Sequence, residues 1–214
     1  MTPTLPVGAA ERGEETRTAL LRAGRQLFAS RGFDGTSVRE ITREAEANLG
    51  AISYHFGSKR AFYQEVLASG LSPLVDRVGI AADGEGTPLD RLEAVVDVFF
   101  DHLAVNPDLP HLLLQEVAAG KTPPPEVVAI LRRNAGHIGR ILAQGWEDGS
   151  LRRGHPTLSA VSVASQPLYM TLVAPLLLDV GGVDLRDPAT RRVAADHVKA
   201  FVRAGLESRE ESHS

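Results

Sequence analysis

Residues 36–60 constrain the fold more than any other part of the chain, because they read as two short helices joined by a tight turn. Thr36 or Ser37 can cap the first helix, and Glu40 would complete a capping box if Ser37 is the cap. Asn48 is expected to cap the second helix, which is only about two turns long. This spacing predicts a helix-turn-helix, the motif that places its second helix in the major groove of DNA.

The second helix of this motif is predicted to turn small side chains and two hydrogen-bonding rings outward. Solvated helix faces are usually built from Glu, Lys and Arg, whereas small residues let a helix lie deep in a groove about 12 Å wide. Serine, tyrosine and histidine can then bond to phosphates and base edges. A plain helical hairpin, with Tyr54 and Phe56 as core aromatics, is the alternative. The predicted outward residues are Leu49, Gly50, Ala51, Ser53, Tyr54 and His55.

Two stretches of this region carry a family resemblance. The first is Gly32-Phe33-Asp34-Gly35-Thr36-Ser37-Val38, and the second, after Ala45, is Gly50-Ala51-Ile52-Ser53-Tyr54-His55-Phe56-Gly57-Ser58-Lys59. Together they resemble the N-terminal domain of the TetR family of bacterial one-component regulators, over roughly residues 14–70. The resemblance implies DNA contacts at or near Thr36, Ser37, Leu49, Gly50, Ala51, Ser53, Tyr54, His55 and Lys59. We add Asn48 and the solvent-facing Arg39 to this set.

Two residues depart from the family pattern. Glu46 stands where the family usually has a glycine in the turn, and Arg60 stands where it usually has a glutamate. Glu46 must therefore accept a left-handed backbone or reshape the turn. A carboxylate placed near phosphate would also weaken DNA affinity, although neither departure removes the motif.

The charge of the chain is unevenly distributed. The net charge is −4, yet residues 12–60 hold nine basic and six acidic residues, which gives this segment +3 and leaves −7 on the rest. A basic end on an acidic body suits contact with DNA at one end only. The chain has no cysteine, which excludes disulfides and fits a reducing cytoplasm. No leader or long apolar run is evident, so a soluble, cytoplasmic protein is expected.

The remaining sequence predicts an all-α fold, with the helix-turn-helix domain followed by a helical bundle. We expect a disordered arm at 1–13, a DNA-binding domain at 14–72 with the motif at 37–56, an effector-binding and dimerisation domain at 73–207, and a disordered tail at 208–214. Besides the motif, helices are predicted over 14–31, 58–79, 88–105, 111–119, 125–148, 157–179 and 188–207.

The last two predicted helices are too apolar to face water and form the candidate dimer interface. The resemblance implies that such a pair builds a four-helix bundle across a twofold axis. Two copies would then read two half-sites on one face of DNA. Filling the core of a monomer is the alternative. The predicted interface residues are Val161, Leu168, Leu172, Leu176, His197, Val198 and Phe201.

A cavity between the helices of the body is the candidate site for a small-molecule effector. Polar groups on mostly apolar helices need a partner, which favours Glu116 and Gln166. The aromatic and histidine residues of the set could equally belong to the core or surface. The predicted lining residues are Phe99, Phe100, His102, Leu113, Glu116, Asn134, His137, Trp146, Gln166, Tyr169 and Met170.

These observations predict a homodimeric repressor that an unidentified small molecule releases from a palindromic operator on double-stranded DNA. In this hypothesis the ligand moves the fourth helix, with Pro73 as the bending point. A helical protein-interaction module and a ligand-responsive activator are the alternatives. The sequence contains no HExxH, GxSxG, P-loop or GxGxxG motif, and its histidines lack metal-ligand spacing, so no enzyme, cofactor or metal site is expected.

Overall fold

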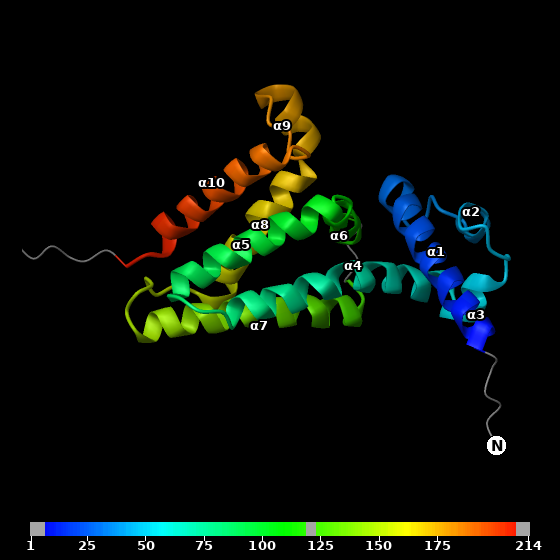
Figure 1. Ribbon diagram of the computed structural model, residues 1–214, viewed down its shortest axis with the longest axis horizontal. Helices are drawn as coiled ribbons and strands as arrows, with labels where there is room; N and C mark the ends of the chain where they lie inside the picture. Colours follow the sequence, from blue (N-terminus) through cyan, green and yellow to red (C-terminus); the bar gives the residue numbers. More distant parts are fainter. Residues whose placement is uncertain (1–6, 119–122, 209–214) are drawn as a thin grey trace, which may run out of the picture. The chain divides into compact units, whose positions relative to one another are not determined.

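The computed structural model describes residues 7–118 and 123–208, with the backbone alone at residues 7–10 and 116. Over these residues the all-α fold class is confirmed, and the only β pairing is an isolated bridge between Leu151 and Glu207. The helices (Figure 1) are α1 (Val7–Arg31), α2 (Val38–Glu44), α3 (Ala51–Phe56), α4 (Lys59–Ala82), α5 (Pro88–Val105), α6 (Leu109–Ala118), α7 (Pro125–Glu147), α8 (Pro156–Leu172), α9 (Ala174–Gly181) and α10 (Pro188–Leu206).

The chain divides into two compact units. The first unit is Met1–Gly70 with His111–Val127, and the second unit is Leu71–Pro110 with Val128–Ser214. The boundary therefore falls inside α4, close to Pro73. Most of α6 belongs to the first unit, whereas the sequence had placed it in the body. The predicted domain limits stay a prediction.

An aromatic cluster holds the first unit together. Phe28 on α1 lies edge-on to Tyr63 on α4, with ring centroids 4.8 Å apart, and lies 5.8 Å from Phe62. Phe62 in turn lies 4.8 Å from Phe56, the last residue of α3. Burying large rings is strongly favourable, so this cluster fixes α1, α3 and the start of α4 against one another.

The centre of the second unit is formed by α5, α8 and α10, which contact one another, and α7 adds a further apolar face. Thr87 and Asp90 form the capping box that starts α5. Two ion pairs join α10 to α5: Arg203 with Glu93 at 2.6 Å, and Lys199 with Asp97 at 3.0 Å. The core includes Leu92, Val95, Val96, Phe99, Phe100, Ile138, Ile141, Leu142, Ala160, Val163, Ala195, Val198 and Val202.

The single apolar helix predicted over residues 157–179 is wrong. α8 ends at Leu172, and α9 begins at Ala174, with a bend of 68° between them. Pro175 explains the break, because it cannot donate a backbone hydrogen bond and its ring would clash with the carbonyl one turn earlier. No described helix alone is long and apolar enough to span a bilayer. α8 and α9 reach that length and composition only as a bent pair.

Two helices start earlier than the sequence predicted. α1 begins at Val7, so residues 7–13 are helical and not part of a disordered arm; Ala9 and Ala10 have a high helix propensity that explains the extension. α6 begins at Leu109, with Pro110 in the first turn, where a missing N–H costs nothing. The rest of the predicted arm (1–6), residue 119 and tail residues 209–214 lie outside the described residues.

Gly24 gives a first testable prediction, because α1 and α4 meet closely there. A Cβ at Gly24 would clash with the Phe62 ring, which Phe28 and Phe56 prevent from moving aside. Gly24→Ala should therefore lower the free energy of unfolding by about 1–3 kcal/mol in a urea titration. Gly136→Ala in α7 is the matched control. Its Cβ would meet nothing within 4 Å, so it should stabilise the helix by about 0.5–1 kcal/mol. Equal stability of the two variants would contradict the close approach.

Candidate DNA-binding site

Ser37 caps α2 and Glu40 completes the capping box, which confirms this part of the sequence prediction. Ser37 Oγ accepts the backbone N–H of Glu40 at 3.2 Å, and Glu40 Oε2 accepts the backbone N–H of Ser37 at 2.8 Å. The hydrogen bonds from the Ser37 side chain and backbone, with a smaller contribution from Arg31, lower the pKa of the Glu40 carboxyl. The box therefore fixes where α2 begins.

Thr36 does not belong to the DNA-facing surface, and its predicted contact is corrected. Its side chain is buried, and its hydroxyl donates to the carbonyl of Gly32 at 2.9 Å. The hydroxyl thus holds the loop before α2 against the end of α1. Ser37, the next residue, is exposed.

The turn between α2 and α3 is left-handed at Glu46, which has a φ of 52°. The N–H of Ala47 donates to the carbonyl of Thr42 at 2.8 Å, so the turn closes back onto α2. Of the two outcomes left open by the sequence, Glu46 takes the left-handed backbone and the tight turn is kept.

α3 begins at Ala51, and the prediction that Asn48 caps this helix is wrong. Gly50 occupies the cap position and supplies no side-chain hydrogen bond. Asn48 acts through its backbone, because its carbonyl accepts the N–H of Ala51 at 2.9 Å. The tight bend through Leu49 and Gly50 delays the helix, and the exposed Asn48 side chain stays available to DNA.

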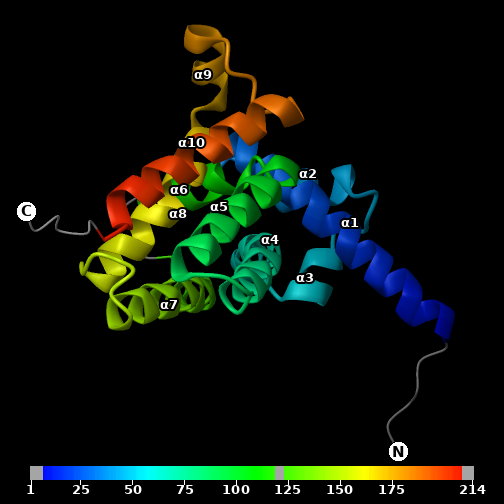
Figure 2. The ribbon, with the colours of Figure 1, turned by 60° about the vertical axis from the view of Figure 1, so that its left-hand side comes forward.

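The outward face of α3 carries small side chains and ends in the rings of Tyr54 and His55, as the sequence predicted. Tyr54 is 81% exposed and Leu49 is 55% exposed, whereas Ile52 is buried. This overturns the alternative in which Tyr54 is a core aromatic. The Tyr54 ring lies edge-on to the His55 ring, with centroids 4.9 Å apart. α3 itself contacts α1 and α2, so its inward side is held (Figure 2).

The two cations of the predicted contact set have different surroundings. Lys59 Nζ donates to the carbonyl of Phe33 and lies 4.3 Å above the Phe33 ring. Lys59 therefore ties the start of α4 to the loop before α2, and only its remaining N–H groups can meet a phosphate. Arg39 is exposed on α2, where its side chain is open to a phosphate.

One hollow in the first unit gathers much of the predicted contact set. Residues from the second half of the motif line it together with Thr16 from α1 and the turn residues Glu46 and Ala47. Sequence reasoning missed Thr16 as a neighbour of the motif, and no local signal could have found it, because only the packing of α1 on α3 brings it there. The lining residues are Thr16, Glu46, Ala47, Asn48, Gly50, Ala51, Tyr54 and His55.

The predicted effector residues do not come together in one site. Phe99, Phe100 and His102 are buried in α5, whereas Tyr169 is 63% exposed on α8. Leu113 lies in the first unit, and the side chain of Glu116 lies outside the described residues. Gln166 is half-buried, and Met170 and Trp146 pack against the core of the second unit.

Two polar residues on α7 stand out from this set. Asn134 is buried, and its Oδ1 has no hydrogen-bond partner among the described residues. His137, on the next turn, contacts α4 at Gly79, and burial together with the charge of Arg140 lowers its pKa. A buried amide oxygen without a partner is costly, so Asn134 is the strongest polar candidate for a ligand contact.

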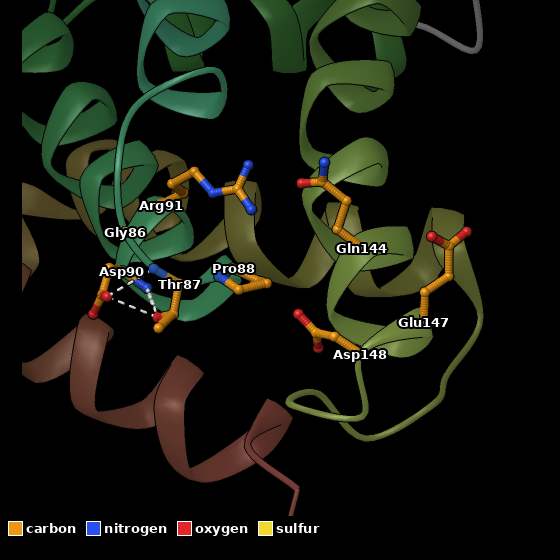
Figure 3. Close-up of a pocket in the computed structure, with 8 residues that line it drawn as sticks. All are labelled: Gly86, Thr87, Pro88, Asp90, Arg91, Gln144, Glu147 and Asp148. Carbon is orange, nitrogen blue, oxygen red and sulfur yellow. Dashed lines mark hydrogen bonds between the residues drawn. The ribbon is translucent and has the colours of Figure 1, made fainter.

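A different hollow in the second unit is lined by the start of α5 and the end of α7 (Figure 3). Arg91 donates to the carbonyl of Ala82 at 3.2 Å, while its buried Nε has no partner among the described residues. None of the predicted effector residues lines it. Its residues are Gly86, Thr87, Pro88, Asp90, Arg91, Gln144, Glu147 and Asp148.

Most of the predicted dimer residues lie at the surface of the second unit. Val161, Leu176 and Phe201 are each more than half exposed, and His197 is exposed. Leu168 and Leu172 are half-buried. Val198 is corrected, because it is fully buried among α5 and α8 and cannot reach a second chain. Further exposed apolar residues on α8 and α10 are Leu158, Tyr169 and Val193.

A capped α2, a tight turn and an exposed two-turn α3 define a helix-turn-helix DNA-binding protein. Two family models match the chain: "Bacterial regulatory proteins, tetR family" over residues 20–66, and "Tetracyclin repressor-like, C-terminal domain" over residues 88–202. The second model alone covers more than half of the chain. The chain therefore belongs to the TetR family, and it is a DNA-binding transcriptional regulator.

Individual proteins support this assignment. The transcriptional regulator UidR of Escherichia coli (strain K12) is 23% identical over 177 residues, which are 83% of this chain and 87% of UidR. The transcriptional repressor KstR2 of Mycolicibacterium smegmatis is 33% identical over 101 residues, 47% of each chain. The structure of the TetR family regulator PfmR from Thermus thermophilus superimposes with a TM-score of 0.70 at 22% identity, covering 88% of this chain and 98% of PfmR. These relatives are regulators and not enzymes.

The capping box gives the second prediction. Ser37→Ala should lower the free energy of unfolding by about 1 kcal/mol at neutral pH, because one N-terminal N–H of α2 loses its partner. The folded-state pKa of Glu40 lies below its ordinary value of 4.5, so the stabilisation by its carboxylate is present above pH 4.5 and is lost as the pH falls through the lowered pKa. Below pH 4.5 the parent protein should thus lose stability more steeply than Ser37→Ala.

Urea titrations at several pH values would measure both effects. Ser30→Ala is the matched control, since Ser30 is exposed on α1 and its hydroxyl bonds only to carbonyls of its own helix. Parallel stability curves for the parent and Ser37→Ala in acid would contradict a role for the Glu40 carboxylate in the box.

Proposed function

We propose that the protein is a homodimeric repressor that binds a palindromic operator through two copies of α3 and leaves the operator when a small molecule binds its second unit. The main support for DNA binding is the outward face of α3, where Tyr54 is 81% exposed beside small residues. Such a face suits the major groove and is poorly explained as a solvated helix surface.

The small size of α3 supports the proposal that the protein is a dimer. A helix of six residues can read few base pairs, and a twofold dimer doubles the number that are read. The apolar residues exposed on α8 and α10 supply a surface that a second copy would cover. Ion pairs to α5 hold α10 in place, so the surface is presented by a fixed helix.

The release step is supported by the buried polar group on α7 and by the boundary within α4. A ligand that gives Asn134 Oδ1 a partner would favour the arrangement in which it binds. Movement of the second unit would then reach the first unit through α4, near Pro73. Because its target is chromosomal DNA, we place the protein in the cytoplasm.

Selection of genomic DNA fragments on the purified protein tests the proposal directly. Enriched fragments should share a palindrome whose half-sites lie about 34–36 Å apart, one turn of DNA. Their affinity should fall steeply with salt, because each phosphate contact releases counterions. A small molecule that abolishes this binding would establish release. Enrichment of no sequence from protein freed of bound ligands would overturn the function.

Tyr54 and His55 give the third prediction. Tyr54→Ala and His55→Ala should each weaken operator binding by about tenfold or more, because a lost base or phosphate contact costs about 1–3 kcal/mol. Tyr54 is exposed, so its loss should hardly change the melting temperature, whereas His55 is half-buried and its loss should lower the melting temperature slightly. His111→Ala, an exposed histidine on α6, is the matched control and should bind as the parent does. Unchanged operator affinity of both variants would contradict the assigned contacts.

Phe201 gives the fourth prediction. Phe201→Glu would bury a charge at the proposed interface twice per dimer, and should raise the dimer dissociation constant by about a hundredfold or more. Sedimentation equilibrium measures this directly, and operator affinity should fall with it. Ile80→Glu on α4 makes the same change at another exposed apolar residue and should leave the dimer intact. Equal effects of the two changes would contradict the interface.

A further inference from the structure

Glu46 holds a backbone conformation that its side chain does not favour. It is the one non-glycine residue with positive φ, at 52°, among the residues that the structure describes. Glycine takes this conformation without steric cost, and asparagine tolerates it better than glutamate does. Strained residues of this kind cluster at functional sites, so an observed outlier is a reason to look for a role.

Glu46 lies beside the proposed DNA-binding face of the first unit. Glu46 is exposed, and it lines the same hollow as Asn48, Tyr54 and His55. No ion pair or side-chain hydrogen bond to Glu46 is found within the described part of the chain. Its negative charge is therefore not neutralised by the protein at the place where phosphates approach.

The turn also holds the backbone of Glu46 in place. The N–H of Glu46 donates to the carbonyl of Arg43 at 3.2 Å, and the next N–H, of Ala47, donates to Thr42 at 2.8 Å. The residue cannot swing away with a mobile loop. An unpaired negative charge carried by this ordered turn beside the α3 face would repel the phosphate backbone when α3 enters a groove.

From these observations we propose that Glu46 limits the strength of DNA binding by electrostatic repulsion. This inference rests on the proposed function. The repulsion acts on the backbone, which is the same in every sequence, so it weakens operator and non-operator DNA alike and leaves the choice of bases to α3. A weakened complex is easier for a ligand to dissociate, and the protein spends less time on non-operator DNA.

The test compares Glu46→Gln with Glu44→Gln on two DNA duplexes: the selected operator, and a shuffled sequence of the same length. Both changes remove one negative charge from an exposed position at or next to the turn between α2 and α3, but Glu44 does not line the hollow. At about 50 mM salt, Glu46→Gln should bind both duplexes about fivefold tighter, and the gain should shrink at about 300 mM salt. Glu44→Gln should gain much less.

Glu46→Gly separates charge from backbone strain. It removes both, so it should bind DNA as tightly as Glu46→Gln and also melt at a higher temperature, whereas Glu46→Gln should melt with the parent. Unchanged affinity of Glu46→Gln, or an equal gain in Glu44→Gln, would overturn the inference. So would a changed base preference in the selection, since the carboxylate would then read bases. If the parent bound no DNA at any salt concentration, the proposed function would fall, and this inference with it.

Discussion

The position of the recognition helix depends on the packing around Phe62. This buried ring contacts Phe56 at the end of α3 and Phe28 in the last turn of α1, and it sits over Gly24, where any side chain would collide with it. α3 has only six residues and no side-chain cap, so it could not persist by itself. Its shape and its outward face exist because tertiary packing fixes its last residue to α4 and its inward residue, Ile52, in the core.

Internal contacts also decide which polar residues of the first unit remain available to DNA. Lys59 donates to the Phe33 carbonyl and lies over the Phe33 ring, and Thr36 donates to the carbonyl of Gly32. Both residues have side chains suited to phosphate, but here they stabilise the loop before α2. What remains open is a face of small residues with Tyr54 and His55, bordered by the unpaired carboxylate of Glu46. This face can meet DNA through its shape and its hydrogen-bonding groups, while Arg39, exposed on α2, can meet a phosphate.

Most of α6 belongs to the first unit and contacts α1 there. Gln115 donates to the carbonyl of Ala29 near the end of α1 at 3.3 Å, and the residues around it group with the first unit although they lie far along the chain. A segment from the middle of the sequence thus supports the helix on which α3 packs. The chain passes between the two units at three places: inside α4, between Pro110 and His111 in α6, and between Val127 and Val128 in α7.

The sequence alone determined the features set by neighbouring residues. These include the capping box of Ser37 with Glu40, the all-α class and the outward face of α3. Predictions from the sequence failed where distant packing or competing local signals determine the structure. Pro175 broke one predicted helix in two while Pro167 did not, and Val198 turned into the core whereas Phe201, predicted for the same interface, stayed exposed. Helix periodicity shows that a side chain is apolar and on which stripe it lies. Whether that stripe faces the core of its own chain or a second chain depends on the angles at which whole helices pack, and these are fixed only by the tertiary structure.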